Sequence, residues 1–195
     1  MTQGYEKDLA YTHDVGFGAF SSESAPGLLK ILRQKGIEKG LVVDLGCGSG
    51  IWAKALTQAG YDVLGIDLSD AMLNLARKKA PKAKFHKASL LRVKLPKCDA
   101  ITLLGECLNY QFDEHSKVEI QELFVQIYKV LRRGGIFIFD IAEPGYVSGA
   151  NPQKTYSEGK DWAILLEKEE DKKSSKLTRT MTIFRRVENL YRSSE

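Results

Sequence analysis

The stretch Val42-Val43-Asp44-Leu45-Gly46-Cys47-Gly48-Ser49-Gly50 decides the fold of this chain. It opens with apolar residues that suit a short buried strand, reaches an acid, and continues through glycines at alternate positions. The residues from Ile51 to Leu56 then have apolar positions at helical spacing. Glycines between a strand and a helix allow positive φ angles and let a ligand come close to the backbone. This turn is therefore predicted to cradle a cofactor.

Strand and helix patterns alternate around this turn. We expect a helix from Pro26 to Lys35 before it, after an irregular segment that follows a short helix near residues 6–11. Beyond the first strand at 41–45, the patterns predict strands at 62–66, 84–86, 98–104 and 136–141, helices at 51–58, 70–80 and 115–131, and a turn at 132–135. This order predicts an α/β fold with three layers, a mainly parallel twisted sheet with helices on both faces, as in Rossmann-like proteins.

Acidic residues stand where the predicted strands end. Asp44, Asp67, Glu106 and Asp140 each follow a different apolar run. In parallel sheets, ligands bind beyond the carboxyl ends of the strands. We therefore expect these side chains to converge on the site.

Two common cofactor motifs do not fit the glycine turn. The dinucleotide fingerprint would require glycine at position 51, where this chain has Ile51. A phosphate-binding loop would require lysine and then serine or threonine after the last glycine, and these are absent. The cofactor is therefore of another class.

The run Asp44-x-Gly46-x-Gly48-x-Gly50, with Asp67 ending the next strand, resembles class I S-adenosylmethionine-dependent methyltransferases. The likeness continues in Gly65–Ser69, Cys98–Ala100 and Leu131–Gly135, and it covers about residues 38–142. It implies a methyltransferase fold and S-adenosyl-L-methionine as the cofactor. A carboxylate attracts the cationic amino acid head of that ligand, whereas it would repel a pyrophosphate.

The resemblance also assigns the cofactor-binding residues. It implies that Asp44 attracts the cationic head and that Asp67 accepts both ribose hydroxyls. The other implied residues are Gly46, Gly48 and Gly50 for close approach, Cys47 as a small residue beside the cofactor, Leu68 beside the adenine, Ser89 and Leu90 at its edge, and Gly105 and Glu106 at the methyl-transfer end. Structural alternatives stay open: Asp44 could cap the following helix, and Gly50 could serve helix–strand packing.

Methyl transfer requires a general base only if the acceptor must lose a proton. The candidates are Glu106 at a strand end, and His13 and Tyr11 on a segment that could form a lid over the site. Tyr5 and Tyr110 are further candidates, and a structural role for His13 is the alternative.

The acceptor is not specified by a motif. The fourth strand ends Leu103-Leu104-Gly105-Glu106, whereas family members that methylate planar amino groups usually have Asn/Asp-Pro-Pro-aromatic there. A small-molecule acceptor is therefore the leading hypothesis; an RNA or protein methyltransferase and a non-catalytic S-adenosylmethionine-binding protein are the alternatives. The basic clusters at 77–87 and 172–186 lack interleaved aromatic residues, so nucleic acid is not the expected partner.

The last fifty or so residues break the alternation. Residues 143–159 suggest a loop, and Trp162–Glu169 and Lys176–Val187 predict an antiparallel hairpin. We expect a single domain with an N-terminal lid and helix (1–36), a cofactor-binding core (37–142), and a loop and hairpin (143–195). The resemblance implies a sixth and a seventh strand, the last one antiparallel, which are not visible in this sequence. The hairpin could replace them or pair with a partner subunit, and a sheet edge left exposed would invite dimerisation, so we expect a monomer or a homodimer.

Composition is that of an ordinary globular protein, with 195 residues, 43% hydrophobic residues and a net charge of +4. No apolar run approaches the ~20 residues of a membrane span, and no signal-peptide pattern opens the chain. The odd number of cysteines, Cys47, Cys98 and Cys107, predicts reduced thiols and a cytoplasmic location. The scattered cysteines and histidines predict no metal site.

Overall fold

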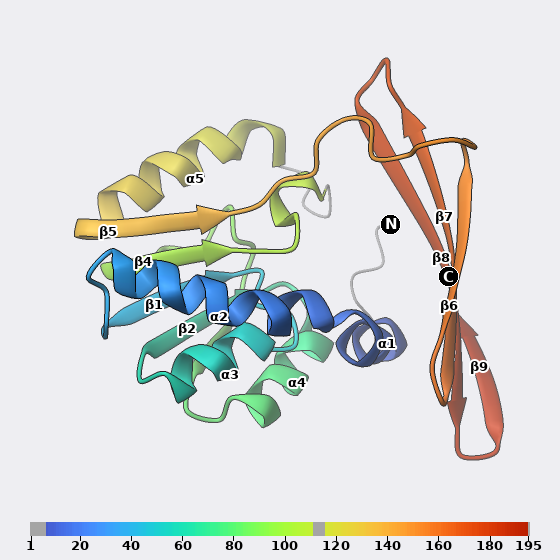
Figure 1. The fold of residues 1–195 in the computed structure, drawn as a ribbon, viewed down its shortest axis with the longest axis horizontal. Coiled ribbons are helices and arrows are strands. Elements are labelled where there is room, and N and C mark those ends of the chain that lie inside the picture. Colours follow the sequence, from blue (N-terminus) through green and yellow to red (C-terminus); the bar gives the residue numbers. More distant parts are fainter. Residues whose placement is uncertain (1–6, 111–115, 195) are drawn as a thin grey trace. The chain divides into compact units, whose positions relative to one another are not determined.

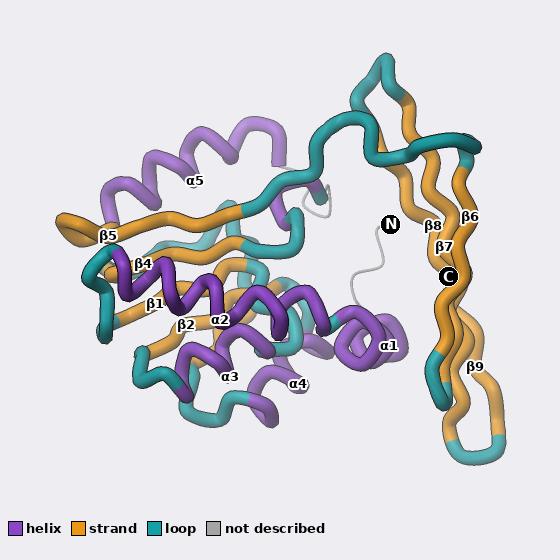
Figure 2. Tube along the Cα trace, viewed as in Figure 1, coloured by secondary structure: helices purple, strands orange, loops and turns teal. Residues whose placement is uncertain are grey.

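The computed structural model describes residues 7–110 and 116–194. The chain divides into two compact units: residues 18–141 build the first, and residues 7–17 join residues 142–194 to build the second. Figures 1 and 2 show the elements of each unit along the chain. The second unit therefore combines two segments that are far apart in the sequence.

The first unit is a parallel five-stranded sheet in the order β3-β2-β1-β4-β5. Its strands are β1 (Leu41–Leu45), β2 (Asp62–Asp67), β3 (Lys84–Lys87), β4 (Cys98–Leu103) and β5 (Leu131–Phe139), and its helices are α2 (Ala19–Gln34), α3 (Ile51–Gln58), α4 (Asp70–Lys79) and α5 (Ser116–Val130). The three-layer α/β prediction is confirmed.

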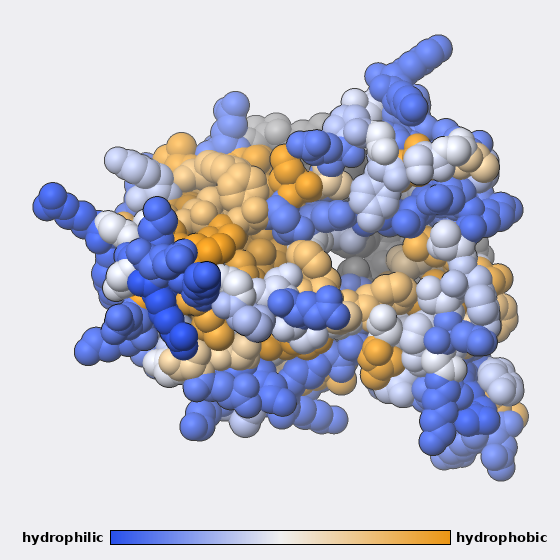
Figure 3. All heavy atoms as spheres, viewed as in Figure 1, coloured by the Kyte–Doolittle hydropathy of each residue, from blue (hydrophilic) through white to orange (hydrophobic). Residues whose placement is uncertain are grey.

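Alternate residues of the buried strands form two cores, one on each face of the sheet. Val42 of β1 packs with Leu32 and Leu56 from α2 and α3, whereas its neighbour Val43 packs with Leu123 of α5. Figure 1 shows α5 on one side of the sheet and α2 and α3 on the other. In Figure 3, hydrophobic residues gather where α5 and β5 lie, and Phe124 and Phe139 are partly exposed there.

The two helices predicted before the first strand are present, but the irregular segment predicted between them was wrong. The structure has α1 (Lys7–Phe17) and then α2, which begins at Ala19 rather than at Pro26. Pro26 is tolerated inside α2 because it lies on the exposed side, where water can solvate the carbonyl group that loses its hydrogen-bond donor. The buried residues Ala25, Leu28 and Leu32 keep helical spacing through the proline.

The turn predicted at 132–135 is an irregular stretch inside β5, which already begins at Leu131. The strand contains an irregularity: Cys98 pairs with Leu131, but Ala100 pairs with Ile136. Gly134, with a φ angle of 82°, lies inside this irregular stretch. The glycine pair therefore serves a bulge within the strand.

The second unit contains an antiparallel sheet in the order β6-β7-β8-β9 together with α1. The predicted hairpin is confirmed as β7 (Trp162–Asp171) and β8 (Lys176–Val187). The flanking strands β6 (Gln153–Glu158) and β9 (Leu190–Ser194) were missed, because they are mostly exposed edge strands of largely polar sequence. Within the described residues, none of the helices is long and apolar enough to cross a membrane.

Candidate functional site

The glycine turn after β1 holds three left-handed residues, with φ angles of 68° at Gly46, 50° at Gly48 and 77° at Gly50. A Cβ atom on Gly46 would lie 2.5 Å from the Sγ of Cys107, and one on Gly50 would lie 2.8 Å from the Cβ of Ala76. A Cβ atom on Gly48 would meet nothing within 4 Å. Two of the glycines therefore serve close packing, while Gly48 borders open space.

Asp67, at the end of β2, ties the glycine turn to the next strand. Its Oδ2 accepts a hydrogen bond from the backbone N–H of Gly48 at 2.9 Å, and its Oδ1 accepts one from Ser69 at 2.8 Å. Burial raises the pKa of this carboxyl group above its ordinary value, and the backbone donors oppose that shift. The structure thus brings Asp67 and Gly48 together.

Asp44 is almost completely buried beneath the turn. Its Oδ1 accepts a hydrogen bond of 2.8 Å from the hydroxyl of Thr102, whose oxygen in turn accepts one of 3.1 Å from the indole of Trp52. Burial raises the pKa of Asp44 to about 7. The alternative role of Asp44 as a helix cap is wrong, because α3 begins after Gly50 without a side-chain cap.

The turn after β4 carries Gly105 and Glu106 in left-handed conformations, with φ angles of 87° and 59°. Both backbone N–H groups donate to the carboxylate of Asp140, at 2.8 and 3.2 Å. A Cβ atom on Gly105 would meet nothing within 4 Å. The sequence pattern placed Asp140 at a strand end, but not as the residue that shapes this turn; Trp52 and Thr102 were likewise missed as supports of Asp44.

The remaining cofactor-binding candidates lie near the ends of β2 and β3. The backbone N–H of Ala88 donates to the carbonyl oxygen of Asp67 at 3.1 Å, which places Ser89 and Leu90 just beyond that strand end. Leu90 packs against the core that contains α5. Leu68 has 45% of its surface exposed, which suits a side chain that contacts a ligand.

The thiols of Cys47 and Cys107 lie beside the glycine turn. Burial raises the pKa of Cys107 to about 12 and that of Cys47 well above its ordinary value. Because only the thiolate is a strong nucleophile, both residues are unreactive at neutral pH. This agrees with the interpretation of Cys47 as a small packing residue.

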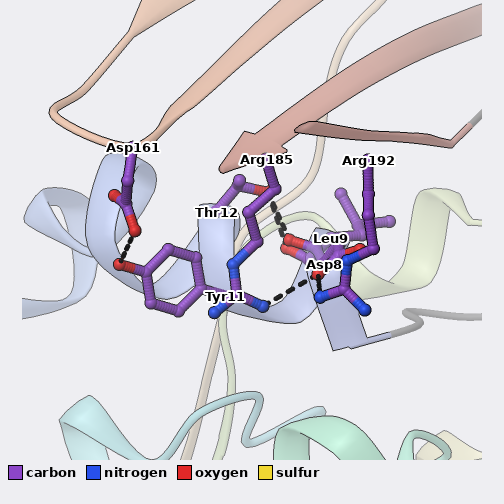
Figure 4. Close-up of polar contacts among 7 residues, drawn as sticks. All are labelled: Asp8, Leu9, Tyr11, Thr12, Asp161, Arg185 and Arg192. Carbon is purple, nitrogen blue, oxygen red and sulfur yellow. Dashed lines mark hydrogen bonds and ion pairs between the residues drawn. The ribbon is translucent and has the colours of Figure 1, made fainter. Parts of the chain in front are cut away.

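Tyr11 and His13 lie on α1, in the second unit, whereas Glu106 belongs to the first. The hydroxyl of Tyr11 donates to Asp161 at 2.8 Å, and this hydrogen bond raises the tyrosine pKa (Figure 4). Burial lowers the pKa of His13, and its ring centroid lies 6.2 Å from that of Phe17. Tyr110 directly follows the short helix η1 (Cys107–Asn109), and Tyr5 lies outside the described residues.

Comparison with known proteins supports a family assignment. The profile of a family described as "Methyltransferase domain" matches residues 42–135. The chain is 29% identical over 126 residues to YqeM of Bacillus subtilis, whose name describes it as a candidate methyltransferase, covering 62% of this chain and 50% of that protein. It is 30% identical over 89 residues to a sugar-nucleotide N,N-dimethyltransferase of Streptomyces venezuelae, dTDP-3-amino-3,4,6-trideoxy-alpha-D-glucopyranose N,N-dimethyltransferase, covering 44% of this chain and 38% of that protein.

The fold is shared with solved structures. An S-adenosylmethionine-dependent methyltransferase from Clostridium acetobutylicum superposes with a TM-score of 0.78 at 19% identity, covering 95% of this chain and 77% of that one. The chain spans about half the length, or less, of the curated relatives that it matches.

Proposed function

Because this chain belongs to the class I S-adenosylmethionine-dependent methyltransferase family, we propose that it binds S-adenosyl-L-methionine beyond β1, β2 and β4 and methylates a small-molecule acceptor. The observation that carries this proposal is the pair of carboxylates, Asp44 and Asp67, on either side of the open glycine turn. Their hydrogen bonds hold them at neighbouring strand ends.

The residues present fit this cofactor. Open space beside Gly48 and Gly105 allows a ligand to approach the backbone at the ends of β1 and β4. The carboxylate of Asp67 suits the paired hydroxyls of a ribose, and the buried Asp44 favours a cationic group above it. The bound cofactor would supply an electrophilic methyl group, and the chain's own task is to orient the acceptor and exclude water.

The candidate bases differ in how readily each side chain can accept a proton in its surroundings. The lowered pKa of His13 leaves its imidazole neutral at pH 7 and able to accept a proton. The hydroxyl of Tyr11 donates to Asp161, and its raised pKa disfavours the phenolate. We therefore propose His13 and Glu106 ahead of Tyr11 for any proton transfer from the acceptor.

A small acceptor is supported by the Streptomyces relative, whose name specifies an amino sugar nucleotide. It is also supported by the end of β4, where Gly105 and Glu106 replace the motif that family members acting on planar amino groups usually carry. The three thiols are free in the structure, which supports a reducing compartment such as the cytoplasm.

Calorimetric titration with S-adenosylmethionine and with NAD tests the cofactor assignment. We expect binding of the first ligand only, and about a 30-fold loss of affinity in Asp67→Ala, because a charged hydrogen-bonding group contributes roughly 2 kcal/mol. Asp62→Ala, at the exposed opposite end of the same strand, is the matched control and should bind normally. Preferential binding of NAD would overturn the proposal.

A second experiment separates the acceptor classes. Formation of S-adenosylhomocysteine should depend on an added amino or hydroxy compound of small size. A requirement for RNA, with steep salt dependence, would favour the RNA alternative. Cofactor binding without turnover for any acceptor class would favour a non-catalytic binding protein.

A further inference from the structure

A large positively charged surface lies outside the proposed site. Residues 71–98 contain nine lysines and arginines and no aspartate or glutamate. All of these cations except Lys79 are exposed, on the end of α4, on β3 and on the loops that flank β3. We call the exposed lysines and arginines of residues 77–87 the basic edge; Lys97, farther along the chain, instead donates to a carbonyl oxygen of α5. Such a long stretch without acids is unusual in a chain that has 25 acidic residues in all.

The basic edge surrounds an unpaired sheet edge. β3 is the end strand of its sheet and pairs only with β2, from Lys84 opposite Leu64 to Lys87 opposite Asp67. Its other side has no strand partner among the described residues of the first unit. The backbone N–H and C=O groups on that side are therefore available to an added strand.

Two classes of polyanion fit this surface poorly. Between residues 70 and 97 no large hydrophobic side chain is exposed, so a membrane would find no apolar anchor there. His86 is the one exposed aromatic side chain in the same range, which provides little stacking surface for nucleic acid bases. Only a polypeptide can both pair with a strand edge and carry negative charge.

We propose that the basic edge binds an extended acidic segment of a partner protein, which adds to the sheet along β3. Lys84 and His86 are exposed on the same side of the strand, and Phe85 points the other way, toward Gly65. Acidic residues at alternate positions of the partner strand would lie beside Lys84 and His86. Lys87 already pairs with Asp70, so the partner's carboxylates compete with Asp70 at that position.

The alternative explanation is that these lysines only prevent unwanted pairing of the edge. The two explanations predict opposite results with an acidic strand-forming peptide. A fluorescently labelled peptide of alternating glutamate and valine is the probe, and anisotropy at low ionic strength is the measurement. We expect saturable binding that weakens as salt is added.

Charge reversal locates the binding surface. Lys82→Glu combined with Lys84→Glu should weaken the peptide about tenfold or more at low salt, because complementary charges become repulsive. Lys172→Glu combined with Lys173→Glu, in the turn between β7 and β8, changes the net charge equally and should leave binding unchanged. Unaltered S-adenosylmethionine binding by the first variant shows that it is folded.

A backbone-modified peptide tests strand addition itself. The same sequence with every backbone amide N-methylated keeps its charge but has no N–H group on either edge to donate to β3, and we expect it not to bind. Equal binding of both peptides would overturn strand addition. Tighter binding of a short DNA duplex, lost in the Lys82→Glu, Lys84→Glu variant, would overturn the proposal in favour of nucleic acid. If neither peptide binds, the proposal is also overturned, and the lysines serve only to prevent unwanted pairing of the strand edge.

Discussion

Each of the two units of this protein is stabilised internally by a different kind of contact. In the first unit, the turns beyond β1 and β2 depend on glycine backbone angles and on a hydrogen bond between residues 19 positions apart, Gly48 and Asp67. In the second, Arg185 donates to Asp8 across 177 positions, and Tyr11 donates to Asp161 across 150. The glycine turn of the first unit is thus organised by local sequence, whereas the contacts of α1 in the second unit join the two ends of the chain.

This difference suggests a division of tasks. A cofactor that is common to a large family can be held by a local motif, which any chain can carry on one strand–turn–helix segment. The second unit joins α1 to β8 by polar and aromatic contacts, such as the guanidinium of Arg185 lying 3.8 Å from the ring centroid of Tyr11. We expect substitutions in the glycine turn to affect the cofactor and those at Arg185 and Tyr11 to affect the packing of α1 on β8.

The strongest test of the glycine turn in the first unit is the substitution Gly50→Ala. The new Cβ atom would lie 2.9 Å from the Cα of Ala76, at a φ angle of 77° that disfavours any side chain. Steric overlap and the left-handed backbone together should lower the free energy of unfolding of the first unit by about 3–4 kcal/mol. Urea denaturation followed by circular dichroism measures the change.

Gly60→Ala is the control for Gly50→Ala. Its φ angle of 94° is equally unfavourable, but the added Cβ atom would meet nothing within 4 Å. We expect a loss of only about 1 kcal/mol, the cost of the backbone conformation alone. Equal losses in the two variants would show that packing against α4 does not constrain the glycine turn.

The second test concerns the pH dependence that Asp44 confers. Its pKa is about 7 in the folded protein against an ordinary value of 3.8, so the folded state binds more protons than the unfolded state between these pH values. Stability should therefore fall as pH rises from about 4 to about 7, by on the order of 3 kcal/mol, and then level off. Asp44→Asn should remove this slope, and urea midpoints across that range measure it.

Asp62→Asn is the matched control, since Asp62 is exposed at the start of β2 and should leave the slope unchanged. If Asp44→Asn retains the full pH dependence, other groups cause it. A positive ligand near Asp44 should favour the ionised carboxylate, so S-adenosylmethionine binding near pH 6 should release protons in the wild type and fewer in Asp44→Asn.

Arg185→Ala is the corresponding test of the long-range contacts between α1 and β8 in the second unit. The substitution removes the ion pair with Asp8 and the contact with the ring of Tyr11, and it should destabilise the second unit by about 2 kcal/mol. The ring of Trp162 contacts Phe17 of α1, so the fluorescence of Trp162 reports whether that helix is released. The measurement is made in a Trp52→Phe background, in which Trp162 is the remaining tryptophan. Arg186→Ala, at the exposed neighbouring position, should change neither signal. An unaltered Trp162 spectrum in Arg185→Ala would show that other contacts hold α1.

The same difference explains how much the sequence could predict. The sheet of the first unit, the glycine turn and the position of Asp67 follow from apolar runs and motif spacing, which are local signals. The roles of Asp140 and Thr102 depend on how neighbouring strands align, and the contacts of α1 depend on residues at the other end of the chain. No pattern within a short window identifies such partners, so Tyr11 and His13 were predicted as lid residues without their neighbours.

The smallest expected effect concerns Glu170, which holds the loop at the start of the second unit. Its buried carboxylate accepts hydrogen bonds from the backbone N–H groups of Gly145 and Val147, at 2.5 and 3.0 Å, and these bonds lower its pKa. The stabilisation is present above the ordinary pKa of 4.5 and is lost as pH falls through the lowered value. Glu170→Gln replaces one accepting oxygen by a donor, so one of the two N–H groups loses its partner.

Hydrogen exchange should therefore quicken at Gly145 and Val147 in Glu170→Gln, while the global unfolding midpoint moves less than in Arg185→Ala. Glu169→Gln, at the exposed adjacent position, should leave exchange unchanged. If the amides of Gly145 and Val147 stay protected from hydrogen exchange in Glu170→Gln, hydrogen bonds within the loop are enough to keep it ordered. The second unit would then resemble the first in depending on short-range structure, and the contrast between them would be confined to the contacts of α1.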